Sequence, residues 1–167
     1  YNLHYPDMIF RTVEAKLRAL VAEIVRNHVL GRPMLVGTTS VESSERLSNR
    51  LRAEQVRRLM QVGLVRQAFM RQSGRQEDGR LIPELEPFNG QLESLTADSL
   101  RKFAVTFGMN SLSLDDAANQ AALLEYLRLP EDSLQRLKSV IQAGVSHQVL
   151  NARKHTEESQ IIAGAGA

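Results

Sequence analysis

The sequence predicts an α/β fold in which two parallel strands are separated along the chain by a block of helices. The first sign is the stretch Pro33–Glu45, where a short apolar run ends in small hydroxylated residues and an amphipathic run begins at once. Such a change is typical of a buried parallel strand that leads into a helix. A second short apolar run lies at 146–150, and the residues between the two runs show helical spacing. With only two convincing strands, the sheet is expected to be incomplete within this chain.

The composition is that of an ordinary globular domain. The chain has 167 residues, of which 43% are hydrophobic and 24% charged, enough for one good core. Aromatic residues make up only 5%, which favours helices packed through Leu, Ala and Val. The net charge of +2 does not indicate binding of polyanions by charge alone. Because there is no Cys, the sequence excludes disulfides, thiolate zinc sites and cysteine nucleophiles.

A first helix is predicted from Thr12, as its N-cap, to about Leu30. Six apolar residues of this segment fall on one helical face: Val13, Leu17, Leu20, Val21, Ile24 and Val25. Gly31 is placed to end the helix, and residues 34–38 follow as a strand.

Ser40 is expected to cap a second helix. On this helix Leu47 and Leu51 should face inward. Four polar residues should face outward: Glu45, Arg46, Asn49 and Arg50.

The middle of the chain is predicted to be helical, beginning with an apolar and basic helix at about 56–70. Residues 72–91 are rich in Gly, Gln, Pro and Glu and are expected to form a loop. Three more helices are predicted at about 96–108, 114–128 and 131–143. The second of these should begin with a capping box at Ser113–Asp116, and Gly144 should end the third.

The last part of the chain returns to the α/β pattern. Residues 146–150 are predicted to form the second strand, and Thr156 to open a final helix at 157–163. The simplest architecture is a parallel strand pair whose crossover connection carries the helical block as an insertion.

Two separate motifs resemble those of SecA, the ATPase motor family of bacterial protein export. Residues Pro33–Glu45, with Leu47–Leu51 after them, resemble the family pattern "PVLVGTTSVE" followed by "SE.LS..L". Residues Gly144–Ala152 resemble "GI.H.VLNA", and the residues from Arg153 onward resemble "K.H..EA.IIA.AG". Both motifs occur in the family's order.

The resemblance covers roughly residues 5–55 and 144–166. Arg153 stands where the family usually has Lys, and Ser159 where it usually has Ala; both departures are mild. The large departure is the block from about Val56 to Ala143, for which the sequence indicates no family.

The resemblance implies a partial RecA-like parallel sheet. Residues 1–55 and 144–167 would form a discontinuous part of a second nucleotide-binding domain, and residues 56–143 a helical insertion subdomain. In such motors ATP binds with Mg²⁺ between two halves, and the first half supplies the phosphate loop and the magnesium carboxylate. This chain has no G-x-x-x-x-G-K-[ST] motif. The chain alone is therefore expected to have no catalytic residue, to hydrolyse no ATP and to bind no cofactor tightly.

The candidate residues for the edge of the nucleotide cleft follow the first strand: Gly37, Thr38, Thr39, Ser40 and Glu42. They lie at the carboxyl end of a strand, where open α/β sheets place ligands, and at a helix start, where amides favour phosphate. The alternatives are structural: Ser40 caps the helix, Gly37 permits tight packing, and Glu42 complements the helix dipole. Both interpretations stay open at this point.

No metal site is expected, because the four histidines are scattered along the sequence: His4, His28, His147 and His155. We expect each to be a sheet-edge or hydrogen-bonded histidine. Asp115 and Asp116 are interpreted as acids at a helix N-terminus rather than as a catalytic pair.

The resemblance also implies partners and a location. The first nucleotide-binding half of the same parent protein would close the cleft, and the parent would meet preproteins and the SecYEG channel. The chain is therefore expected to be cytoplasmic and peripherally associated with the cytoplasmic membrane.

Seven arginines give the first part of the helical block a basic bias: Arg52, Arg57, Arg58, Arg66, Arg71, Arg75 and Arg80. One interpretation is a basic amphipathic helix that binds an anionic membrane surface or an acidic partner. The other is a helix that packs its apolar side on the three later helices and leaves its arginines in water. Nucleic acid is not expected as a partner, because no aromatic stacking platform accompanies the arginines.

Two other function classes remain open from the sequence. One is a stand-alone helical interaction module on an α/β scaffold, and the other is part of a superfamily 2 nucleic-acid helicase. The combined "GTTSVE" and "VLNA" motifs favour the export motor by resemblance.

Overall fold

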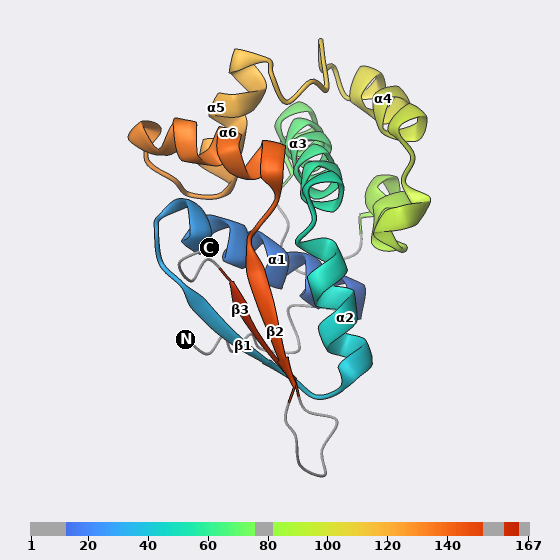
Figure 1. The fold of residues 1–167 in the computed structure, drawn as a ribbon. Coiled ribbons are helices and arrows are strands. Elements are labelled where there is room, and N and C mark those ends of the chain that lie inside the picture. Colours follow the sequence, from blue (N-terminus) through green and yellow to red (C-terminus); the bar gives the residue numbers. More distant parts are fainter. Residues whose placement is uncertain (1–12, 76–81, 152–158, 164–167) are drawn as a thin grey trace.

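The computed structural model describes residues 13–75, 82–151 and 159–163. Figure 1 shows a small sheet with two helices, α1 (Val13–Val29) and α2 (Val41–Arg50), in the lower part of the view. A group of helices occupies the upper part, and α3 (Ala53–Ser73) leads from α2 into that group. The molecule is therefore mixed α and β, as predicted, and most of its regular structure is helical.

The first helix and the first strand form as the sequence predicts. Helix α1 is followed by Gly31 with φ +75°, a left-handed conformation that glycine adopts without strain, and strand β1 spans Met34–Thr38. The predicted cap at Thr12 lies outside the described residues.

Helix α2 begins and packs as predicted, with one exception. Ser40 is its N-cap, and Leu47 and Leu51 are buried. Arg50 was expected to face outward, but only 2% of it is exposed. The prediction was wrong because Arg50 has an ion-pair partner, Glu14 on α1, that the local pattern of α2 does not reveal.

The sheet has the order β1-β3-β2, where β2 spans His147–Asn151 and β3 spans Ser159–Ala163. Both outer strands pair antiparallel with β3, so β1 and β2 run in the same direction without touching. The predicted pairing of two parallel strands is therefore wrong for the described residues, because β3 lies between them.

The predicted final helix at 157–163 is also wrong where it is described, since residues 159–163 form β3. Ile161 is fully buried and Ile162 is half-buried, so exposure changes from one residue to the next, as in a strand. Strand β3 has a hydrogen-bonded neighbour on each side, and this pairing outweighs the helical pattern of the segment.

The middle of the chain is helical, as predicted. After α3 come α4 (Ala97–Thr106), α5 (Ala117–Tyr126) and α6 (Leu134–Ala143). Short 3₁₀ helices join them: η2 (Pro83–Asn89), η3 (Leu92–Ser94) and η4 (Glu131–Ser133). Two details differ from the prediction: η2 lies in the expected loop, and α5 is capped by Asp116 rather than by Ser113.

Helix α3 is the centre of the molecule. It contacts α1 and α2 on one side and α4, α5 and α6 on the other, and its apolar residues are buried from Val56 to Phe69. Gly63 lies within this helix, and the ring of Tyr126 packs against it. A Cβ on residue 63 would lie 2.9 Å from the Tyr126 ring, which explains a glycine at this position. One hydrophobic cluster joins α3 to the sheet residues Met34 and Ile161.

Candidate functional site

The predicted cleft edge is the turn between β1 and α2. Ser40 caps α2 with its hydroxyl group: the oxygen accepts from the N–H of Ser43 at 3.0 Å, and the O–H donates to the Ser43 Oγ at 2.9 Å. The Thr38 hydroxyl donates to the carbonyl of Ser40 at 3.4 Å. The structural role predicted for Ser40 is therefore confirmed, and the turn has a defined geometry.

Three of the five candidate residues in this turn are exposed: Gly37, Thr39 and Glu42. A Cβ added at Gly37 would have no atom within 4 Å. Tight packing within the described residues therefore does not explain this glycine. Glu42 lies in the first turn of α2, where its charge complements the helix dipole. Chain adjacency brings the five residues together on one open edge, and their role toward a nucleotide stays a prediction.

A second feature, which the sequence analysis did not single out as a pair, links α2 to β2. The Nδ1 of His147 lies 2.8 Å from the carbonyl oxygen of Val145, so this nitrogen donates its proton. In the neutral ring Nε2 then accepts from the hydroxyl of Ser48 at 2.6 Å. A backbone carbonyl occupies the position that a carboxylate takes in a catalytic triad. The pair therefore ties a helix to the sheet, and His147 is hydrogen-bonded as predicted.

Of the remaining histidines, His28 is the one that lies among the described residues. Burial lowers the pKa of His28 near the end of α1, so burial there favours the neutral ring. His4 and His155 lie outside the described residues. Among the residues that the structure describes, no group of three His, Cys, Asp or Glu side chains could hold a metal ion. No described helix is both long and apolar enough to cross a bilayer.

A buried ionic cluster joins the sheet part, which is the sheet with α1 and α2, to the helical block. The carboxylate of Glu14 on α1 forms ion pairs with the Nη2 of Arg50 at 2.8 Å and the Nε of Arg18 at 3.2 Å, and it accepts from the backbone N–H of Leu92 at 3.0 Å. Arg50 also pairs with Glu93 at 3.3 Å. Burial lowers the pKa of Arg18, and Glu14 opposes this shift. The cluster fixes the 3₁₀ segment to both α1 and α2.

The two ends of the helical block, at Leu51 and Val145, lie side by side where they join the sheet part. The N–H of Val145 donates to the carbonyl of Leu51 at 2.9 Å, and Gly144 lies against residues 51–53. A Cβ on Gly144 would lie 2.6 Å from the backbone nitrogen of Ala53, so only glycine fits. The two ends of the helical block are therefore in direct contact, although the domain division itself stays a prediction.

The described arginines of α3 and its neighbours differ in their partners. Arg57 donates to the carbonyls of Ile141 and Gln142 at the end of α6, at 3.0 and 3.4 Å. Arg52 and Arg75 make exposed ion pairs with glutamates. The apolar residues of α3 are buried in the core, as the second interpretation of this helix predicted. Contact of its arginines with a membrane stays a prediction.

Comparisons with known proteins agree with the two motifs. Residues 2–66 match the family model of the SecA P-loop domain. The chain is 33% identical over 165 residues to protein translocase subunit SecA of Thermus thermophilus, an alignment that covers 97% of this chain and 15% of that protein. It is 29% identical over 162 residues to protein translocase subunit SecA of Aquifex aeolicus, an alignment that covers 97% of this chain and 12% of that protein. Protein translocase subunit SecA 2 of Streptomyces avermitilis is 56% identical over 52 residues, an alignment that covers 31% of this chain and 6% of that protein. No solved structure matches the chain.

These matches support SecA as the family of this chain, and its relatives are translocase subunits by name. The chain spans 15% or less of the length of these three relatives. Because the two long alignments cover 97% of the chain, they extend across residues 56–143, which the sequence analysis assigned to no family. The assignment to a second nucleotide-binding domain stays a prediction.

Proposed function

We propose that this chain is part of the second nucleotide-binding half of a SecA-type motor, which uses ATP to move proteins across the bacterial cytoplasmic membrane. The observation that carries the proposal is the alignment with a named translocase subunit over 97% of the chain. The absence of a G-x-x-x-x-G-K-[ST] motif from the sequence favours the second half over the first.

In this proposal the turn from Gly37 to Glu42 forms one edge of a cleft that holds ATP with Mg²⁺ in the complete protein. The first half of the parent supplies the phosphate loop, and this half follows the nucleotide state. The exposed positions of Gly37, Thr39 and Glu42 support this role, because a partner half can reach them. The isolated chain hydrolyses no ATP.

We also propose that β1 and β2 belong to a larger RecA-like sheet in the complete protein. They run in the same direction, and β3 lies between them and pairs antiparallel with each. The motor would act on preproteins at the SecYEG channel, in the cytoplasm and peripherally at the membrane. Residues 56–143 would be an inserted helical subdomain, as the contact between Leu51 and Val145 at its ends supports.

Gly37 gives the sharpest test of the cleft edge. In the complete protein that contains this chain, Gly37→Ala adds a methyl group that meets no described atom of this half. We expect its thermal stability to be unchanged and its ATPase rate to fall about tenfold or more, the scale of a small misplacement in a closed site.

Gly90→Ala is the matched control, because its added Cβ makes only an ordinary contact, 3.6 Å from the Ser94 hydroxyl. Its ATPase rate should equal that of the parent protein. Equal rates for the two variants would remove Gly37 from the cleft. Turnover of ATP by the isolated chain, lost on substitution of its own residues, would contradict the assignment to an inactive half.

A further inference from the structure

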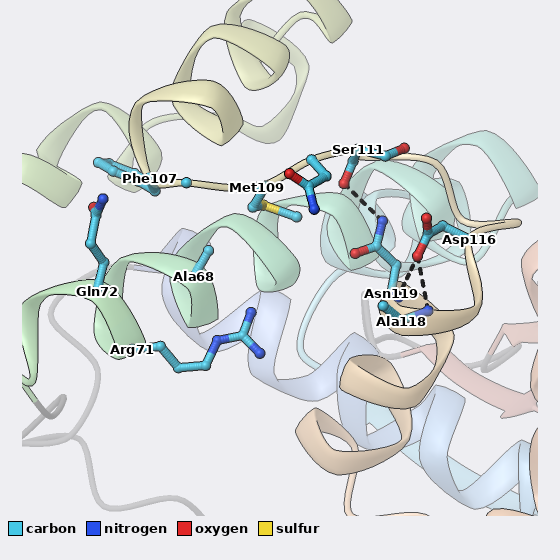
Figure 2. Close-up of a pocket in the computed structure, with 11 residues that line it drawn as sticks. Ala68, Arg71, Gln72, Phe107, Met109, Ser111, Asp116, Ala118 and Asn119 are labelled. Atoms are coloured by element: carbon cyan, nitrogen blue, oxygen red, sulfur yellow. Dashed lines mark hydrogen bonds between the residues drawn. The ribbon is translucent and has the colours of Figure 1, made fainter.

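A cavity of about 490 Å³ lies in the helical block, away from the predicted cleft edge. Figure 2 shows that the C-terminal half of α3 forms one wall. The segment from Phe107 to Ser111 and the first turn of α5 form the other. Its volume is within the range of sites that bind small molecules.

One lining side chain is held in place by the protein. Asn119 is 8% exposed, and its amide nitrogen donates to the carbonyls of Ser111 at 2.9 Å and Ser113 at 2.8 Å. Both amide hydrogens are thereby used, so its Oδ1 is left as a fixed acceptor. In Figure 2 this oxygen points toward the α3 side of the cavity.

Two charged side chains complete the polar lining. Arg71 is exposed in the last turn of α3 and makes no hydrogen bond or ion pair with any described residue. Asp116 uses one carboxylate oxygen to cap α5, at 2.9 Å from the N–H of Ala118 and 3.1 Å from that of Asn119. Its other oxygen accepts no bond from the described residues and remains available to a ligand.

The cavity also has an apolar part, formed by Ala68, Phe107 and Met109. The ring of Phe107 is held by two others, with centroid distances of 5.1 Å to Phe69 and 6.1 Å to Phe103. A fixed aromatic wall next to a flexible methionine suits a buried aliphatic side chain.

These groups define the chemistry of the ligand. One cation is balanced by one carboxylate, so the lining does not suit a polyphosphate. Gln72, Asn110 and Asn119 are amides, which offer donors and acceptors that match peptide groups. We propose that this cavity binds an extended segment of a separate polypeptide: its N–H groups donate to Asn119 and Asp116, a carbonyl accepts from Arg71, and an aliphatic side chain contacts Phe107 and Met109.

The proposal is tested with the whole chain and a short capped peptide that alternates glycine and leucine. Binding is followed by NMR, and the expected shifts are confined to the amides of residues 68–72 and 107–119. The same peptide with serine in place of leucine should bind at least about tenfold more weakly, because it lacks the apolar contact. ATP should cause no shifts at these residues.

Two variants examine the site without removing a partner of another described residue. Arg71→Gln should weaken peptide binding about tenfold, since a hydrogen bond from a charged group is lost. Ala118→Leu adds bulk at an exposed helical position of the lining and should abolish binding. Arg32→Gln is the matched control, because Arg32 is exposed, lies between α1 and β1, and makes no side-chain bond with the described residues.

Peptide binding that Arg71→Gln and Ala118→Leu leave unchanged, or no shifts at millimolar peptide, would overturn the proposal. So would equal binding of the leucine and serine peptides, or shifts with ATP in place of peptide. None of these results bears on the ATPase cleft, which the Gly37 variants test separately.

Discussion

At the scale of single residues, two glycines share a positive φ but lie in different surroundings. Gly31 has φ +75° and Gly144 has φ +76°. A Cβ on Gly31 would meet nothing within 4 Å, whereas one on Gly144 would lie 2.6 Å from the nitrogen of Ala53 and 2.7 Å from the carbonyl oxygen of Leu51. Gly144 also has ψ −168°, a region that is essentially restricted to glycine, so it combines backbone strain with steric overlap.

We expect Gly31→Ala to lower the free energy of unfolding by about 1–2 kcal/mol, the cost of a left-handed alanine. Gly144→Ala should cost roughly a further 1–3 kcal/mol, because the backbone of residues 51–53 must shift and because alanine rarely adopts the φ and ψ of Gly144. Urea denaturation of both variants measures the difference. Equal costs would mean that the contact between the two ends of the helical block is not tight in solution.

The residues also show what local sequence can and cannot predict. The cap at Ser40 and the helix end at Gly144 were predicted, because each depends on residues within one turn. The inward position of Arg50 was missed, because its partners Glu14 and Glu93 lie 36 and 43 residues away. Asn119 gave no signal, because its role depends on how the segment before α5 folds over it.

At the scale of elements, the ionic cluster around Glu14 is the polar contact that joins α1, α2 and the segment η2–η3. Arg18 adds to this contact by donating to the backbone carbonyls of Phe88 and Gly90. The side chains of Glu14 and Arg50 are only 9% and 2% exposed, so solvent screens their pairing little.

Glu14→Gln should therefore lower the free energy of unfolding by about 3–5 kcal/mol, because it leaves the charge of Arg50 buried with less compensation. The control is Glu54→Gln, which breaks an exposed pair with Arg52 and should cost under about 1 kcal/mol. Adding Arg50→Met to Glu14→Gln should recover part of the loss, since the uncompensated charge is then removed. Chemical denaturation monitored by circular dichroism gives all three values. A small cost for Glu14→Gln would show that the cluster contributes little.

The elements of the sheet show a different limit of sequence analysis. Strand β1 was predicted from its own residues, whereas β3 was expected to be helical. Residues Gln160–Ala163 have no local sequence feature that favours a strand strongly enough to outweigh their helical spacing. Their strand state depends on pairing with Met34–Gly37 and with His147–Leu150, which lie outside the segment itself.

At the scale of the whole molecule, the sequence predicts two parts and the structure has one continuous core. The hydrophobic cluster runs from Met34 and Ile161 in the sheet through α3 to Leu123 on α5. Parts that share a core and a buried ionic cluster lose their packing together. A single domain with one core usually unfolds in a single step.

We therefore expect one cooperative transition, with equal calorimetric and van't Hoff enthalpies. Leu47→Ala in the sheet part and Leu123→Ala in the helical block make a matched pair, because both leucines are at most 1% exposed. Each should cost about 2–5 kcal/mol and lower the temperature of the same single transition. NMR signals of α5 and of β1 should disappear together on heating in both variants. If each variant instead lowered only the melting temperature of its own part, residues 56–143 would be an independently folding insertion. The helical block would then be coupled to the sheet through the contacts at Leu51 and Gly144 and through the ionic cluster around Glu14, rather than through a shared core.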